Sequence, residues 1–96
     1  MQKKNILIVG AGHGIGLSLV KKILQSFEEP CVFATYRVKE KAEELLDLDD
    51  KNLIKYQVDP SEDNDLIFLK KSISDKTCSL DLVILCMGVL DSENSF

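Results

Sequence analysis

The sequence predicts an α/β fold in which a parallel β-sheet is flanked by helices. Short apolar segments rich in β-branched residues alternate with longer segments whose apolar residues recur every three or four positions, in the order β-α-β-α-β-α-β. Strands separated by helix-length segments pair in parallel through right-handed crossovers, and we expect the strand order 3-2-1-4. A chain of 96 residues has room for one small domain or for part of a larger one.

The first half of the chain supplies two strands and two helices. Buried strands are expected at Asn5–Val9 and Cys31–Tyr36, which are short and almost wholly apolar. The segment 39–48 is rich in strong helix formers and predicts the second helix. The first helix is expected at 15–27, with one buried stripe formed by Ile15, Leu19, Val20, Ile23, Leu24 and Phe27.

The second half repeats this alternation. Residues 52–59 alternate between apolar and polar, which predicts a half-covered strand toward one edge of the sheet. A helix is expected from Pro60 or Ser61 to about residue 74, because Pro and Ser suit a helix start and acidic residues fill its first turn. Its stripe consists of Leu66, Leu69 and Ile73. Residues 80–87 form a continuous apolar strand that ends before Gly88.

Composition excludes several classes of protein. The net charge of −4 and the absence of a basic face argue against a duplex-binding protein, and no apolar run approaches the ~20 residues that span a bilayer. Three cysteines at unrelated spacings form no metal motif. We therefore expect a reduced, cytoplasmic protein with no structural metal.

Four glycines occupy every second position directly after the first strand, at Gly10, Gly12, Gly14 and Gly16. Ligands of an open parallel sheet bind at the carboxyl ends of its strands, and the first turn between strand and helix lies there. A helix N-terminus binds phosphate, and glycine lets the phosphate approach because it has no Cβ. The segment GAGHGIG therefore predicts a dinucleotide phosphate turn in a Rossmann-type sheet. A tight turn with incidental glycines is the alternative.

The spacing G-x-x-x-G-x-G, at Gly10, Gly14 and Gly16, resembles the short-chain dehydrogenase/reductase family, whose turn reads Thr-Gly-x-x-x-Gly-Ile-Gly. Ile15 matches the isoleucine of this motif, whereas Val9 stands where the family usually has threonine and loses a hydroxyl contact in the turn. Within the family, the pattern most resembles bacterial cell–cell signalling C-factor proteins. The resemblance covers nearly the entire chain.

Three further segments carry the resemblance, and the first of them, ATYR, ends the second strand with Arg37 just past it, as is frequent in the family. The resemblance implies that Asp59, followed by Pro60, hydrogen-bonds the adenine amino group. It also implies that the fourth strand passes beside the cofactor ribose, although Leu85, Cys86 and Met87 replace the family's Asn-Asn-Ala and only Gly88 is kept. Because the asparagines help lock that strand, its hydrogen bonding differs from the family pattern here.

The end of the second strand bears on the choice of cofactor. An acid there would bind the ribose 2′-hydroxyl of NAD, whereas arginine can hold the 2′-phosphate of NADP. Tyr36 and Arg37 occupy this position, with no acid before Glu40, and His13 precedes Gly14, where NADP-preferring relatives often have a basic residue. We expect NADP rather than NAD. Arg37 could instead be a surface residue, and a solvated loop histidine explains His13 equally well.

The catalytic Tyr-x-x-x-Lys pair of the family is missing, because Tyr36 is followed four places later by Glu40, and Tyr56 by Pro60. We expect residues 1–96 to be a single partial domain, truncated before the catalytic half of an NAD(P)-dependent oxidoreductase and inactive alone. It should self-associate or pair with the missing half. The alternatives are a non-catalytic NAD(P)-binding sensor or interaction module and a chain that pairs through its sheet edge. The sequence does not identify the substrate.

Overall fold

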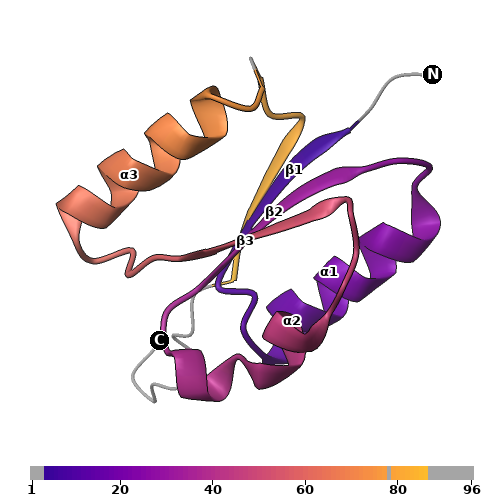
Figure 1. Ribbon diagram of the computed structural model, residues 1–96, viewed down its shortest axis with the longest axis horizontal. Coiled ribbons are helices and arrows are strands. Elements are labelled where there is room, and N and C mark those ends of the chain that lie inside the picture. The colour runs from indigo at the N-terminus through magenta and orange to yellow at the C-terminus, as the bar shows by residue number, and fades with distance from the viewer. Residues whose placement is uncertain (1–3, 78, 87–96) are drawn as a thin grey trace.

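The computed structural model describes residues 4–77 and 79–86. Strands and helices alternate along them as the sequence predicts (Figure 1). In chain order the elements are β1 (Asn5–Val9), α1 (Gly14–Ser26), β2 (Cys31–Tyr36), the 3₁₀ helix η1 (Lys39–Lys41), α2 (Glu43–Asp47), β3 (Leu53–Gln57), α3 (Asp63–Ser74) and β4 (Leu82–Leu85).

The four strands form one parallel sheet in the order β3-β2-β1-β4, which confirms the predicted topology. The central strand β1 aligns Ile8 with Ala34 of β2 on one side and with Ile84 of β4 on the other. Figure 1 shows α1 and α2 on one face of this sheet and α3 on the other. All the carboxyl ends of the strands therefore lie at one edge, where a ligand of such a sheet binds.

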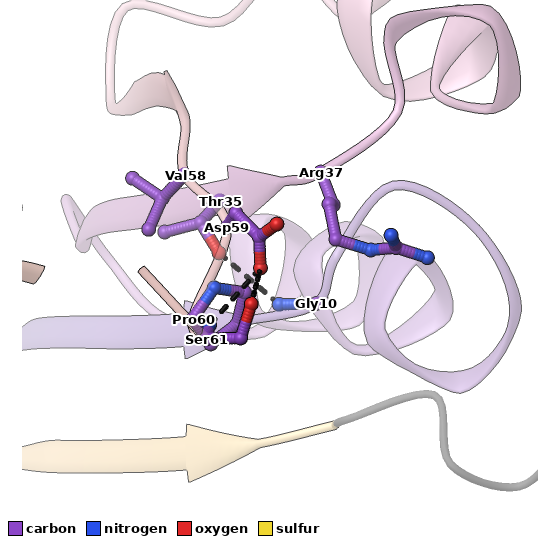
Figure 2. Close-up of a pocket in the computed structure, with 7 residues that line it drawn as sticks. All are labelled: Gly10, Thr35, Arg37, Val58, Asp59, Pro60 and Ser61. Carbon is purple, nitrogen blue, oxygen red and sulfur yellow. Dashed lines mark hydrogen bonds between the residues drawn. The ribbon is translucent and has the colours of Figure 1, made fainter. Parts of the chain in front are cut away.

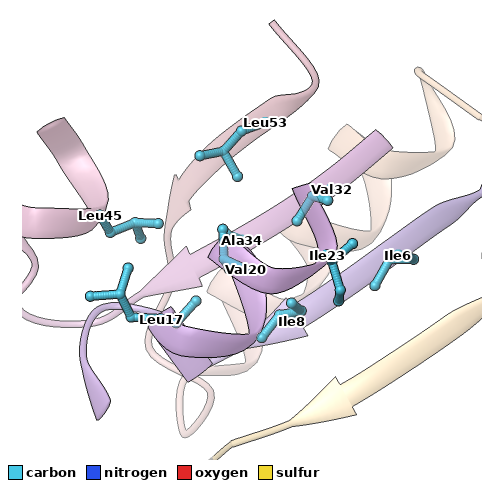
Figure 3. Close-up of a cluster of buried hydrophobic side chains, with 10 residues drawn as sticks. Ile6, Ile8, Leu17, Val20, Ile23, Val32, Ala34, Leu45 and Leu53 are labelled. Carbon is cyan, nitrogen blue, oxygen red and sulfur yellow. The ribbon is translucent and has the colours of Figure 1, made fainter. Parts of the chain in front are cut away.

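The face under α1 and α2 holds the larger core cluster (Figure 3). Helix α1 buries Gly16, Leu17, Val20 and Ile23 against this face. The buried apolar stripe expected for this helix was wrong at its first and last residues, because Ile15 is 71% exposed and Phe27 is 41% exposed. At 100° per residue, Ile15 points about 140° away from Val20, and Phe27 follows the last helical residue. The core side chains of this face are Ile6, Ile8, Ala11, Leu17, Val20, Ile23, Val32, Ala34, Leu45 and Leu53.

Of the described helices, α3 alone covers the opposite face. Leu69 and Ile73 of α3 pack with Phe33 in a second core cluster, which also contains Leu7, Val9 and Val58. The ring of Tyr56 lies 6.5 Å from that of Phe33, and burial, followed by the nearby Cys31 and Asp75, raises the pKa of the Tyr56 hydroxyl. Leu66, expected in the buried stripe, is instead 41% exposed.

The second helical segment is divided, whereas one helix was expected over 39–48. Ala42 leaves helical geometry between η1 and α2, and its buried methyl group packs beside Gly12 of the glycine turn. The Nζ of Lys55 on β3 donates to the carbonyl oxygens of Leu46 and Leu48, at 3.0 and 2.6 Å. These bonds satisfy carbonyl groups at the C-terminal end of α2 and fix this short helix over the sheet.

Helix α3 begins at Asp63 rather than at Pro60 or Ser61. The Asp59 carboxylate accepts a hydrogen bond from the Ser61 amide at 3.0 Å, which is the i to i+2 bond of an Asx turn. The Asp65 carboxylate, in the first turn of α3, accepts a 2.8 Å bond from the Asp59 amide. This turn holds residues 59–61 outside the helix.

Strand β4 lies at the edge of the sheet and is shorter than the expected 80–87. Leu82, Val83 and Leu85 are between 47% and 65% exposed, so β4 is not the doubly buried strand that its apolar sequence suggests. Met87 lies outside the described residues. No helix within the described residues is long and apolar enough to cross a membrane.

Candidate functional site

A pocket of about 420 Å³ opens at the carboxyl ends of β1, β2 and β3 (Figure 2). This is the position in which a parallel sheet binds its ligand, because the loops that follow neighbouring strands converge there. Three separate loops contribute to the wall of the pocket: the start of the glycine turn, the end of β2 and the loop after β3. The lining residues are Gly10, Thr35, Arg37, Val58, Asp59, Pro60 and Ser61.

Gly10 starts the glycine turn in a conformation that only glycine adopts readily. Its φ is +87°, and a Cβ built on it would overlap the carbonyl oxygen of Cys86 and lie 2.9 Å from that residue's carbonyl carbon. The Cys86 amide in turn donates a 2.7 Å hydrogen bond to the carbonyl oxygen of Val9. The backbone of residue 86 therefore runs directly against the turn, and a side chain at position 10 has no room.

Gly12 and Gly16 lie in closely packed positions, and at Gly16 the backbone leaves no room for a side chain. A Cβ on Gly12 would lie 3.2 Å from the Cβ atoms of both Tyr36 and Ala42. A Cβ on Gly16 would overlap the carbonyl oxygen of Gly10 and lie 2.9 Å from the Cα of Ala11. These two glycines let α1 and η1 approach the turn closely.

Gly14 does not pack closely against the start of the helix. We expect a Cβ here to collide with the pyrophosphate or with the packed helix start; nothing lies within 4 Å of its position, so the expected collision with the helix start was wrong. Its φ of +65° explains the glycine instead, since residues with side chains rarely adopt it. The open space beside Gly14 leaves the start of α1 accessible to a ligand.

His13 and Ile15 flank Gly14 and are both exposed. His13 is the N-cap of α1 in extended conformation, with φ −160° and ψ 177°, and its side chain makes no capping hydrogen bond. The first turn of α1 contains no acidic residue. Amide groups at a helix start that lacks a side-chain cap, together with the helix dipole, favour an anion at this point.

Arg37 lies just after β2 and is exposed. Its carbonyl oxygen accepts a 3.3 Å hydrogen bond from the Gln57 side chain, which ties it to the end of β3. In Figure 2 its side chain extends away from the turn formed by Asp59, Pro60 and Ser61. Among the described residues it forms no ion pair, so its guanidinium is available to an anion at the mouth of the pocket.

Asp59 is held by its neighbours on the opposite wall. Its Oδ1 atom accepts hydrogen bonds from both the Ser61 amide, at 3.0 Å, and the Ser61 hydroxyl, at 2.7 Å. These bonds, first the hydroxyl and then the amide, lower the pKa of the Asp59 carboxyl, and the positive charge of Arg37 lowers it further. Asp59 is therefore a fixed carboxylate whose Oδ2 atom accepts no hydrogen bond from the described residues.

The structure gathers the predicted site residues in three places. Gly10, Arg37, Asp59 and Pro60 line the pocket. Tyr36 packs against Gly12, and Cys86 against Gly10. The remaining predicted residues of the turn, which are His13, Gly14, Ile15 and Gly16, lie at the start of α1. Met87 and Gly88 fall outside the described residues, and so does any contact they make.

Sequence reasoning missed Thr35, Val58 and Ser61, which also line the pocket. In the sequence, Thr35 and Val58 lie near the ends of strands and belong to no binding motif. The signal for Ser61 was present, because a serine two residues after an aspartate is a common Asx-turn pattern. Within residues 4–77 and 79–86 there is no group of three His, Cys, Asp or Glu side chains that could hold a metal ion.

Comparison with solved structures relates this geometry to that of a known protein. The fold is similar to the crystal structure of a protein assigned as the carbonyl reductase Sniffer of Caenorhabditis elegans, with a TM-score of 0.78 and 26% sequence identity. The match covers 88% of this chain and 37% of the Sniffer chain. No family model matches the sequence, and no curated protein does.

The fold and the pocket together define a class of protein. The chain is a Rossmann-type α/β protein with the fold of the short-chain dehydrogenases/reductases. It spans little more than a third of the length of the solved structure that it matches.

Proposed function

We propose that this chain is the NAD(P)-binding portion of a short-chain-type oxidoreductase, which transfers hydride between NADP(H) and a carbonyl or alcohol substrate. The single observation that supports this most strongly is the pocket at the ends of β1, β2 and β3, because Gly10, Arg37 and Asp59 meet in its wall from three different loops. A nicotinamide dinucleotide carries the three groups that these residues suit: a pyrophosphate, a second sugar phosphate and an adenine.

The pyrophosphate would lie over the turn from Gly10 to Gly14 and the first amides of α1, with His13 and Ile15 exposed beside it. Asp59 would accept a hydrogen bond from the adenine amino group through Oδ2, since Ser61 occupies Oδ1. Pro60 lines the same wall. Cys86, Met87 and Gly88 would follow the ribose through their backbone.

We propose NADP rather than NAD as the preferred cofactor. The exposed guanidinium of Arg37 carries the charge that a 2′-phosphate requires, and Tyr36 rather than an acid precedes it. Arginine can hold a phosphate bidentately, whereas an acid would repel it. The lowered pKa keeps Asp59 negatively charged. This charge does not oppose a 2′-phosphate beside Arg37, because the Asp59 carboxylate is hydrogen-bonded to Ser61 on the opposite wall of the pocket.

The bound nicotinamide would supply the hydride chemistry. The residues of this chain would bind and orient the cofactor, and none of them matches the Tyr-x-x-x-Lys pair that moves the proton in the family. We therefore propose that residues 1–96 form a partial domain and that the catalytic residues belong to another part of the parent protein. We also propose a cytoplasmic location, from the odd number and unrelated spacings of the three cysteines, and a relationship to C-factor-like members, from the turn sequence.

The second candidate is a non-catalytic NAD(P)-binding module that reports the state of the cofactor to a partner. The observation that favours it is the sequence at the end of β4, where Leu85, Cys86 and Met87 replace the family's Asn-Asn-Ala. The two candidate functions share the cofactor-binding site. They differ only in whether the parent protein catalyses hydride transfer.

Titration of the purified chain with NADPH and with NADH, followed by calorimetry or by the fluorescence of the reduced nicotinamide, tests the shared binding site. We expect saturable binding with NADPH preferred, and ATP serves as a control for general nucleotide binding. If the chain binds neither NADPH nor NADH, both candidate functions are refuted. We also expect no steady oxidation of NADPH with carbonyl substrates, and turnover by this chain alone would show that it contains catalytic residues we have not identified.

A further inference from the structure

Thr35 is the one buried polar side chain among the described residues that also lines the pocket, and it is only 1% exposed. Its hydroxyl oxygen accepts a 3.2 Å hydrogen bond from the amide of Gly10, drawn as a dashed line in Figure 2. Its carbonyl oxygen accepts a 2.7 Å bond from the amide of Ala11. Through these two bonds, β2 fixes the first two residues of the glycine turn.

In the bond from Gly10 the Thr35 hydroxyl acts only as an acceptor. A threonine hydroxyl accepts hydrogen bonds and also donates one, and buried polar hydrogens are seldom left unpaired. No described residue accepts the proton of the Thr35 hydroxyl. Because Thr35 is buried in the wall of the pocket, a molecule inside the pocket is the acceptor best placed to pair with it.

The residue at position 9 strengthens the case for Thr35. Val9, the last residue of β1, has no hydroxyl group, so β1 supplies no hydroxyl to the turn. The structure instead brings a hydroxyl to Gly10 from the neighbouring strand β2, from a residue 25 positions beyond Gly10 in the chain.

We infer that Thr35 is a positioning and binding residue of this site, whose hydroxyl orients Gly10 and donates its proton to an oxygen of the bound dinucleotide. This inference rests on the proposed function and adds to it a residue that the glycine motif does not contain. It assigns Thr35 to recognition of the ligand as well as to the stability of the turn.

Three substitutions in the 96-residue chain test the inference, each titrated with NADPH by the fluorescence of the reduced nicotinamide. Thr35→Val keeps the shape of the side chain and removes the hydroxyl, and we expect the dissociation constant to rise about tenfold. Thr35→Ser keeps the hydroxyl, and we expect a dissociation constant within about twofold of wild type. Thr77→Val is the matched control, because the Thr77 hydroxyl contacts Asn5 at 2.9 Å, at the opposite end of β1.

Thermal denaturation of each variant separates binding from stability. If Thr35→Val melts at a lower temperature but binds NADPH as tightly as wild type, Thr35 is only structural and the inference is overturned. If Thr35→Val does not fold, Thr35→Ser is compared with Thr35→Cys, which replaces the hydroxyl by a weak donor; equal dissociation constants for the two would overturn it. A wild-type chain that binds neither NADPH nor NADH would refute the proposed function itself, and the inference with it.

Discussion

Arg37 and Asp59 lie in the wall of one pocket, and the positive charge of Arg37 contributes to lowering the pKa of the Asp59 carboxyl. The two residues come from the loops after β2 and β3, which are neighbouring strands of the sheet. A cation and a carboxylate at the ends of adjacent strands give the pocket two chemically different sides. One side can pair with a phosphate and the other can accept from a hydrogen-bond donor, as the proposed dinucleotide with a 2′-phosphate would need.

Substitution of Arg37 tests the preference for NADP. Arg37→Asp should weaken NADPH binding about ten- to a hundredfold and NADH binding much less, because a charge-assisted bidentate contact contributes about 1.5–3 kcal/mol. Calorimetric titration of both cofactors onto both proteins gives the comparison. Lys39→Asp, in the exposed 3₁₀ helix two residues further on, controls for the change in net charge. An equal loss for NADPH and NADH would mean that Arg37 does not contact the 2′-phosphate.

Gly14 allows the effect of backbone strain to be separated from contact with the ligand. Gly14→Val should abolish dinucleotide binding and also destabilise the fold by about 1–3 kcal/mol, because a β-branched residue must adopt a φ of +65°. Gly14→Asn should be better tolerated in the fold, since asparagine accepts this conformation, but its Cβ should still obstruct the pyrophosphate. Melting temperatures and NADPH titrations of both variants are the measurements. Tight binding by Gly14→Asn would contradict the phosphate-turn assignment.

The lowered pKa of Asp59 predicts a specific dependence of stability on pH. A carboxyl group whose pKa is lower in the folded state stabilises the protein above its unfolded pKa of about 3.9. This contribution should be lost as the pH falls from that value through the lower, folded pKa. The melting temperature of wild type minus that of Asp59→Asn should therefore be positive at neutral pH and shrink below about pH 4. Ser61→Ala removes the largest cause of the shift, so it should reduce the same difference; a difference that stays constant with pH would contradict the assignment.

The exposed edge of the sheet predicts self-association. Val83 and Leu85 of β4 are 49% and 65% exposed, and no described strand pairs with the outer side of β4. An unpaired apolar edge strand recruits another chain, so light scattering at micromolar concentration should detect oligomers. Val83→Lys should shift the chain toward monomer, whereas Ile67→Lys, at an exposed apolar position on α3, should not. A monomeric wild-type chain with a cooperative melting transition would refute this prediction.

The sequence by itself determined the alternation of strands and helices, the parallel order 3-2-1-4 and the position of the glycine turn. These features depend on chain connectivity and on local periodicity, such as the helical spacing of Val20 and Ile23 and the alternation in residues 52–59. The sequence also pointed to Arg37 and Asp59 as residues at strand ends, because the carboxyl ends of parallel strands meet at one edge.

Only the tertiary structure decided which of these residues touch and why. Ile15 is apolar yet exposed, because α1 is rotated so that Leu17 and Val20 face the sheet. Gly14 has a positive backbone angle that favours glycine, and the expected collision of a Cβ with the helix start is absent. The contact between Thr35 and Gly10 joins residues 25 positions apart, and it depends on the register that pairs Ile8 with Ala34. Strand register depends on which residues of each strand are buried on the two faces of the sheet, and that burial involves residues far apart in the chain.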